Sequence, residues 1–236
     1  MKKKLGRKIL KWLGLILAAF FVGTLLWVVA LKWVPVRRTP LMINRAIEYR
    51  SDSSFKTLQT WVSLDKISPY LMKAVIASED NRFPQHSGFD LESIRRAEKV
   101  NRKAGKIVQG ASTISQQTAK NVFLWSGRSW LRKGLEAYFT VLIEQIWGKQ
   151  RIMEVYLNVA EFGRGVYGAE AAARKFFRCS ASSLSLDQSC LMAASLPSPL
   201  KRNLARPGKY HIKRAGQIKN LIGKIEYPEW IRKSGK

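Results

Sequence analysis

The sequence predicts a mainly α protein with one N-terminal transmembrane helix followed by a single helical domain. Three observations support this prediction. Residues 12–31 form an apolar run without a charge, apolar residues after position 68 recur at helical spacing, and segments of alternating β-branched residues are few. With 236 residues, of which 46% are hydrophobic, the chain is long enough for an anchor and one domain with its own core.

The apolar run from Trp12 to Leu31 is long enough to cross a bilayer. At about 1.5 Å per residue, its twenty residues span a hydrocarbon core of about 30 Å. No small-residue cleavage pattern follows it, which favours an uncleaved anchor over a signal peptide. The flank before the run holds more cations than the flank after it, so we expect residues 1–11 to be a basic cytoplasmic tail and residues 33–236 to lie outside the cytoplasm. The preceding cations are Lys2, Lys3, Lys4, Arg7, Lys8 and Lys11, and the following ones are Lys32, Arg37 and Arg38.

The chain is strongly basic, with a formal net charge of +26. Residues 1–32 hold seven cations and no acid, which leaves 35 cations and 16 acids on the exported part. Such a surface attracts anions, and outside the cytoplasm the expected partners are membrane lipid or a lipid that carries phosphate, with no nucleic acid. The two cysteines, Cys179 and Cys190, are compatible with a bridge or with two buried thiols, and the sequence leaves their redox state open.

Cap residues place the first helices in order. Residues 32–67 are expected to form a connector that includes a short sheet within 40–65, and the domain is expected over 68–236. Ser68 precedes a helix with Pro69 at its first position, and that helix ends at Glu79. Asp90 is placed to cap a second helix.

Thr113 and Gln116 have the spacing of a capping box, which predicts a third helix. Ser129 is placed to cap a long fourth helix that Gly148 ends. Its apolar face is expected to hold Leu131, Leu135, Tyr138, Leu142 and Ile146. Further helices are expected near 149–160, 166–177, 182–195 and 208–224.

The acidic pair Glu79 and Asp80 is the first candidate for chemistry. A negative charge is unfavourable at a helix C-terminus, so Glu79 is either a solvated acid or a carboxylate with a raised pKa that accepts a proton. Asp80 is expected to accept hydrogen bonds from backbone amides of the turn that ends at Gly88. Phe83 is expected to pack in the core, and His86 to hold the turn by hydrogen bonding rather than to act in catalysis.

A second polar group follows on the third helix and its neighbour. Thr113, Gln116 and Lys120 share one helix face, which suits a phosphate or sugar ligand near a helix N-terminus, or a capped surface helix. Glu136 lies one helical turn after Arg132. It either forms a simple ion pair with Arg132 or is a second carboxylate of the site that Arg128, Arg132 and Lys133 hold ionised. The apolar stretch 122–130 belongs either to the core or to a surface that dips into the bilayer.

Five ordered motifs in this sequence resemble those of the peptidoglycan glycosyltransferases of the penicillin-binding-protein type. The chain is most similar to the monofunctional biosynthetic transglycosylases of Gram-negative bacteria. The motifs lie at residues 79–88 (Glu-Asp-x-x-Phe-x-x-His-x-Gly), 110–117 (Gly-x-Ser-Thr-Ile-Ser-Gln-Gln), 132–136 (Arg-Lys-x-x-Glu), 149–158 and 164–177. Two positions depart from the family pattern, because Ser115 replaces a threonine and Phe176 a common tyrosine.

The resemblance implies a lysozyme-like fold with a small membrane-facing lobe that includes residues 122–130. It also implies an enzyme of the bacterial inner membrane, with a periplasmic catalytic domain, that polymerises lipid II and a lipid-linked glycan strand into β-1,4-linked chains. Glu79 matches the general base and Glu136 the second essential glutamate, near which part of the family places a divalent cation, Mg or Mn. The residues that match the substrate cleft are Ser112, Gln117, Lys120, Arg128 and Arg132, and those that match its structural support are Asp80, Phe83, His86, Gly88, Thr113, Gln116 and Lys133.

The resemblance further implies sensitivity to moenomycin and partners among transpeptidases and cell-division or elongation proteins, since no Ser-x-x-Lys acyl-transfer domain is expected in this chain. Two rival functions remain open. A lysozyme or lytic transglycosylase also uses a glutamate on a helical domain, but it needs no site for a lipid phosphate. The cations near Lys120 suit such a phosphate site and therefore favour glycan synthesis. A catalytically silent membrane scaffold is the second rival.

Overall fold

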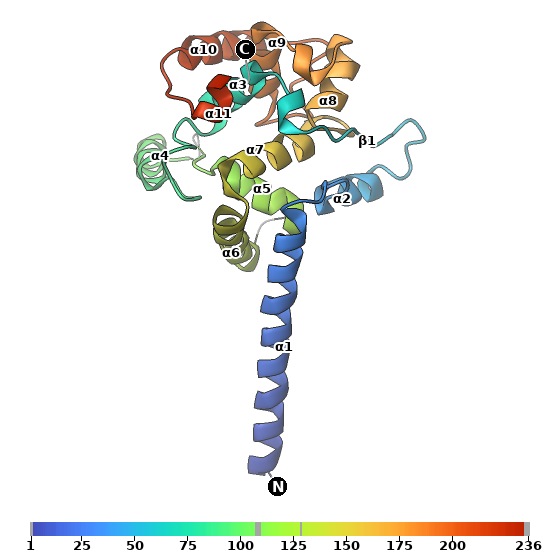
Figure 1. Cartoon of the computed structure of the whole chain (residues 1–236), viewed down its shortest axis with the longest axis vertical. Helices are drawn as coiled ribbons and strands as arrows, with labels where there is room; N and C mark the ends of the chain where they lie inside the picture. The colour runs from blue at the N-terminus through green and yellow to red at the C-terminus, as the bar shows by residue number, and fades with distance from the viewer. Residues whose placement is uncertain (1, 107–109, 128, 234–236) are drawn as a thin grey trace. The chain divides into compact units, whose positions relative to one another are not determined.

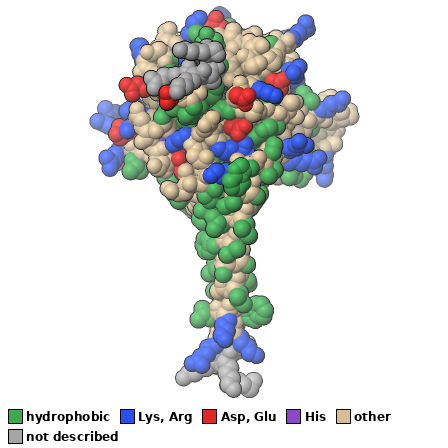
Figure 2. Space-filling view, viewed as in Figure 1, with side chains coloured by type: hydrophobic (Ala, Val, Ile, Leu, Met, Phe, Trp, Pro, Cys, Tyr) green, Lys and Arg blue, Asp and Glu red, His purple; other side chains and the backbone are tan. Residues whose placement is uncertain are grey.

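A computed structural model describes residues 2–106, 110–127 and 129–233 of the chain. The chain divides into two compact units, Met1–Pro35 and Val36–Lys236. The first unit contains one helix, α1 (Lys2–Leu31), in which the 26 residues Gly6–Leu31 form a candidate membrane span. Figure 1 shows this helix without a break, and Figure 2 shows hydrophobic side chains along it and Lys or Arg side chains near its N-terminal end.

Within the part of the chain that the structure describes, α1 is the one helix long and apolar enough to cross a membrane. It contains the predicted span Trp12–Leu31 but begins ten residues earlier, at Lys2. The basic segment before Trp12 is therefore helical, in keeping with the high helix propensity of Lys, Arg and Leu.

The second unit is mainly α, as predicted. Its helices and strands follow in the order α2 (Pro40–Glu48), β1 (Leu58–Gln59), η1 (Leu64–Lys66), α3 (Pro69–Glu79), α4 (Leu91–Ala104), α5 (Ile114–Phe123), α6 (Trp130–Ile146), α7 (Gly148–Val159), β2 (Glu161–Gly163), β3 (Val166–Tyr167), α8 (Ala169–Ala172), η2 (Ala173–Phe177), η3 (Ala181–Ser183), α9 (Leu186–Ser195), α10 (Lys209–Ile222) and α11 (Glu229–Lys233).

Three of the four predicted cap side chains form the expected hydrogen bonds. Asp90 accepts from Ser93 N, Thr113 and Gln116 form both bonds of a capping box, and Ser129 accepts from Arg132 N. Ser68 is also the N-cap residue of α3, but its hydroxyl does not cap the helix. It donates instead to Leu184 O at 2.9 Å and so ties the start of α3 to the segment before α9.

The structure corrects the prediction in three places. The expected connector contains the helix α2, which Thr39 caps with Pro40 at its first position, and the compact unit already begins at Val36. In α6 the buried face holds Phe139, Thr140 and Ile143, whereas Leu131 is 69% exposed. The expected helix 166–177 starts as the strand β3 and ends as the five-residue π-helix η2.

A three-stranded sheet has the order β1-β3-β2. β1 pairs with β3 in parallel, with Leu58 opposite Val166, and β2 pairs with β3 antiparallel. Only β1 falls in the expected range 40–65, because its partners lie about a hundred positions later in the chain. This pairing ties the segment before α3 to the segment after α7.

Two groups of helices form the body of the second unit. α3, α9 and α10 pack on one another in the first group, and α5 packs on α6 and α7 in the second (Figure 1). A backbone contact joins the groups, because Ile114 N at the start of α5 donates to Asp80 Oδ2 just beyond α3 at 3.0 Å. The C-terminal end of α3 and the first turns of α5 therefore meet between the two groups.

Candidate active site

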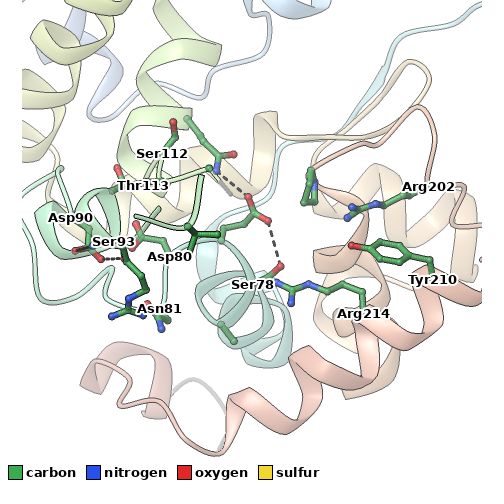
Figure 3. Close-up of a pocket in the computed structure, with 18 residues that line it drawn as sticks. Ser78, Asp80, Asn81, Asp90, Ser93, Ser112, Thr113, Arg202, Tyr210 and Arg214 are labelled. Carbon is green, nitrogen blue, oxygen red and sulfur yellow. Dashed lines mark hydrogen bonds between the residues drawn. The ribbon is translucent and has the colours of Figure 1, made fainter. Parts of the chain in front are cut away.

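A cavity of about 650 Å³ opens where α3 ends. Its lining combines the last turn of α3, residues along α4, the segment before α5, and residues of α10 and the loop before it. Figure 3 shows Arg202, Tyr210 and Arg214 on one side and Asp90 with Ser93 on the opposite side. Glu79 is the last residue of α3 and reaches this cavity as a partly exposed carboxylate.

Glu79 is held in place by a short chain of hydrogen bonds. Gln117 Nε2 on α5 donates to Glu79 Oε2 at 3.0 Å, and Ser78 Oγ donates to Glu79 Oε1 at 3.4 Å. Behind them, Tyr156 Oη on α7 donates to Gln117 Oε1 at 3.2 Å, which fixes the amide with its N–H₂ toward the carboxylate. Three helices therefore orient one carboxylate.

The environment of Glu79 suits a group that accepts a proton. Burial raises the pKa of the Glu79 carboxyl above its ordinary value, while hydrogen bonds from Gln117 and Ser78 and the charges of Arg214 and Arg202 oppose that rise. Burial also raises the pKa of Tyr156 well above its usual range, so its hydroxyl keeps the proton that it donates to Gln117. A carboxylate with a raised pKa is a stronger base than an exposed one.

Asp80 and His86 form the turn that follows Glu79. His86 Nδ1 accepts from Gly88 N at 3.1 Å, so Nε2 carries the proton and donates to Asp80 Oδ1 at 2.9 Å. His86 therefore holds the turn, in the way that the sequence suggested. Asp80 differs from the expectation, because its backbone donor is Ile114 N of α5 and not an amide of its own turn. Its side chain is turned toward α5 and caps that helix from outside.

Phe83 and Gly88 pack this turn against the helices around it. Phe83 is fully buried, and the Lys149 ammonium lies 4.5 Å from the centre of its ring. Gly88 has a φ of +94°, and a Cβ there would lie 2.8 Å from Thr140 Cγ2. Its carbonyl accepts from Thr113 Oγ1 at 2.7 Å, so the turn is joined to the start of α5 a second time.

A second cavity, of about 370 Å³, lies on the other side of Gln117. Gln117 and Pro197 line both cavities, and Lys120 and Tyr156 line this one. Burial lowers the pKa of the Lys120 ammonium, and the charges of Glu136, Arg132 and Lys133 act on it as well. Among the described residues, the Lys120 ammonium has no partner in a hydrogen bond or ion pair. A shielded cation without a partner is suited to bind an anion.

Glu136 is a buried carboxylate on α6 that is held between two cations. Arg132 Nη1 lies 3.4 Å from Glu136 Oε2, and Lys133 Nζ donates to Glu136 Oε1. These two cations and Lys120 outnumber the single acid, so the cluster keeps a net positive charge. Among the described residues, no group of three His, Cys, Asp or Glu side chains lies close enough together to hold a metal ion, so Glu136 is the one carboxylate of this cluster.

The structure thus separates the predicted site residues into groups. Glu79, Gln117 and Ser112 line the first cavity, Lys120 lines the second, and Arg132 and Lys133 are engaged with Glu136. Thr113 also lines the first cavity, but its hydroxyl caps α5 and donates to Gly88 O, and Gln116 Oε1 accepts from Thr113 N in the same capping box. Arg128 lies outside the described residues.

Several lining residues escaped the sequence analysis. Ser78 adjoins Glu79, whereas Arg202, Tyr210 and Arg214 reach the first cavity from the C-terminal part of the chain. The Arg202 guanidinium lies 5.2 Å from the centre of the Tyr210 ring. On the sequence, these three look like ordinary members of a basic, exposed segment. The packing of α10 on α3 brings Tyr210 and Arg214 to Glu79. Arg202, in the loop before α10, donates to a backbone carbonyl of α9.

The apolar stretch 122–130 is divided between core and surface. Val122, Phe123 and Leu124 are buried, and Phe123 stacks on Phe139 with ring centres 4.5 Å apart. Trp125 and Trp130 are 46% and 93% exposed. This stretch is therefore part core and part exposed surface.

Comparison with known proteins agrees with this arrangement. The family model described as Transglycosylase matches residues 45–222. A biosynthetic peptidoglycan transglycosylase of Bacteroides thetaiotaomicron is 51% identical over 220 residues, which are 93% of this chain and 88% of the relative. Proteins of the same description from Caulobacter vibrioides and Pseudomonas entomophila are 49% and 48% identical, and each match covers 94% of this chain and 93% or 94% of the relative. The chain therefore belongs to the transglycosylase family and is a glycosyltransferase of the biosynthetic type that its motifs resemble.

Proposed function

We propose that this chain is a peptidoglycan polymerase that transfers a lipid-linked glycan chain to the 4-hydroxyl of lipid II and releases undecaprenyl pyrophosphate. The observation that carries the proposal is the position of Glu79. Its carboxylate has a raised pKa, is oriented by Gln117, and stands beside a second cavity that holds the unpaired cation Lys120. Gln117 thus lies between a base, Glu79, and an anion site at Lys120. This arrangement suits the transfer of a sugar from a phosphate leaving group.

Glu79 supplies the base. A sugar hydroxyl is a weak nucleophile until a carboxylate takes its proton, and a positioned base contributes about 10²–10⁴-fold. Gln117 and Ser78 keep the carboxylate oxygens in fixed directions, so that one of them faces the acceptor hydroxyl without a prior rotation. Direct attack on the anomeric carbon in one step inverts the α-linked donor to a β-1,4 product.

Positive charge assists the leaving group. A pyrophosphate departs with its negative charge, so it needs cations more than it needs a proton donor. Lys120 is free to bind it, and the net positive cluster of Arg132, Lys133 and Glu136 adds to the field there. This differs from glycan hydrolysis, in which an acid must protonate the leaving oxygen. In the first cavity, Arg202 and Arg214 offer further positive charge to the diphosphates of the substrates.

The membrane arrangement belongs to the same proposal. α1 anchors the chain in the inner membrane with its basic end in the cytoplasm, and the second unit works in the periplasm. The exposed Trp125 and Trp130 suit the interface of a bilayer, where tryptophan is favoured and where both lipid-linked substrates reside.

One experiment tests the reaction against hydrolysis. The purified full chain is incubated in detergent with labelled lipid II, and in parallel with finished sacculi. We expect glycan polymer from lipid II, inhibition of its formation by moenomycin, and no soluble muropeptides from sacculi. Release of muropeptides without polymer formation would show that the enzyme cleaves glycan instead.

A further inference from the structure

A third cavity, of about 680 Å³, is lined by residues that precede α3 in the chain. One wall is α2, which contributes Met42, Ile43 and Ala46, and the other is the segment from Thr57 to Trp61 that contains β1. Figure 1 shows α2 and β1 on the same side of the second unit, joined by a loop. This cavity shares no residue with those that hold Glu79 and Lys120, and the proposed reaction leaves it without a role.

The lining of this cavity is divided into a charged part and an apolar part. Arg37 and Arg38 form the charged part, and both are exposed and free of any ion pair within the described ranges. Met42, Ile43 and Trp61 contribute apolar surface, and Ile43 stays 51% exposed. Unpaired guanidinium groups beside apolar side chains match an amphiphile that has an anionic head and a hydrocarbon tail.

Hydrogen bonds between distant segments hold the floor of the cavity. Gln59 Nε2 donates to Val36 O at 2.9 Å and to Asn158 O at 3.0 Å, so the β1 segment is tied both to the chain before Arg37 and to α7. On the other wall, Thr39 is buried and caps α2 by accepting from Met42 N. The two arginines are therefore attached to a fixed backbone at the cavity edge.

The length of the chain places these arginines near a bilayer surface. Arg37 follows Leu31, the last residue of α1, by six positions. A fully extended chain spans at most about 3.6 Å per residue, so these six positions cover no more than about 22 Å. When α1 spans the membrane, Arg37 and Arg38 thus stay within reach of the headgroup layer on the side to which the chain continues.

We propose that this cavity binds an anionic phospholipid of the surrounding bilayer. The lipid phosphate lies between Arg37 and Arg38, and the glycerol and upper acyl chain lie along Met42, Ile43 and Trp61. Such a bound lipid holds α2 and the β1 segment at the membrane surface. The site is a binding site only and takes no part in the transfer reaction.

Binding is measured by native mass spectrometry of the full chain in detergent, titrated with phosphatidylglycerol or with phosphatidylcholine of the same acyl chains. We expect the wild type to retain one phosphatidylglycerol in preference to phosphatidylcholine. Each cation near an anionic lipid contributes roughly a fivefold gain, so the double variant R37Q/R38Q should lose about 25-fold in affinity for phosphatidylglycerol. The matched control K209Q/K213Q removes two exposed cations from α10 and should bind like the wild type.

A second variant distinguishes lipid binding inside the cavity from a diffuse attraction of the lipid to the two arginine charges. Ala46→Trp fills the cavity and keeps both arginines, so it should also abolish the preference for phosphatidylglycerol. A photoreactive amino acid at Ile43, in vesicles that hold only this protein and phosphatidylglycerol, should give a lipid adduct. Unchanged lipid binding in R37Q/R38Q or in Ala46→Trp would overturn the proposal, as would an adduct between two protein chains. None of these readouts depends on catalysis, so they stand or fall apart from the proposed polymerase activity.

Discussion

Replacing Gln117 by leucine tests how the protein sets the proton affinity of Glu79. Gln117 Nε2 donates to Glu79 Oε2 at 3.0 Å, which favours the ionised carboxylate, whereas burial disfavours it. The variant Gln117→Leu removes the favourable contact and keeps the burial. The pKa of Glu79 should therefore rise further. Because Glu79 must be ionised to act as a base, the acidic limb of the rate profile should move to higher pH.

The hydrogen bond sets the size of this effect. A hydrogen bond to a charged group contributes about 1.5–3 kcal/mol, and one pKa unit corresponds to about 1.4 kcal/mol. Since Glu79 keeps the bond from Ser78 and some contact with water, we expect a shift at the lower end, by about one pH unit. The assay is the initial rate of polymer formation from labelled lipid II, divided by substrate concentration, between pH 4.5 and 9.

Tyr156→Phe is the matched control. It keeps the Gln117 amide but removes the hydroxyl that orients it, so its acidic limb should shift in the same direction by less. If Gln117→Leu lowered the rate equally at every pH, with the acidic limb in place, Gln117 would act as a substrate contact. The assigned role in tuning Glu79 would then be refuted.

Three further predictions concern single side chains. Lys120→Met should lower the rate of polymer formation about 10²-fold, since it removes the unpaired ammonium of the second cavity. Lys120→Arg should keep part of the wild-type rate. A wild-type rate for Lys120→Met would contradict the role of Lys120 in binding the leaving group. Asp80→Ala should lower the free energy of unfolding in urea by about 3 kcal/mol, because Ile114 N loses its acceptor, and a loss below about 1 kcal/mol would speak against this link. Gly168→Ala should destabilise the fold by more than about 2 kcal/mol, since the φ of Gly168 is +82° and a Cβ there would lie 2.7 Å from Asn158 O. The control Gly134→Ala, where a Cβ would lie in open space, should stabilise α6 by about 1 kcal/mol in the same titration.

The starts of the helices were predictable because the signals that set them are local. Asp90, Thr113 and Ser129 each bond to a backbone amide three positions later, so the sequence alone predicts the cap and the helix after it. α2 carries the same local signal in Thr39 and Pro40, but the prolines and the turn residues around it favoured a connector. The sheet could not be predicted in full, because β1 pairs with a strand about a hundred positions later.

The buried face of α6 was predicted wrongly because hydrophobicity alone does not decide which side of a helix meets the core. Leu131 belongs to the most apolar face but lies in the first turn, where it is exposed, whereas Glu136 is buried by its pairing with Arg132 and Lys133. Within the candidate site, Glu79 could be singled out from the sequence, because an acid at the C-terminus of a helix is unfavourable. The contacts that adjust it, from Gln117 and Tyr156, depend on how three helices pack, and no local pattern encodes them.

The central claim is that the Glu79 carboxylate takes the proton of the acceptor hydroxyl, and the variant Glu79→Gln tests it most directly. The amide keeps the size and the hydrogen-bonding capacity of the side chain but cannot accept that proton at neutral pH. Polymer formation from labelled lipid II should fall by at least about 10²-fold, while the folded state and the binding of labelled moenomycin remain. Polymer formation at the wild-type rate by a folded Glu79→Gln protein would contradict the account.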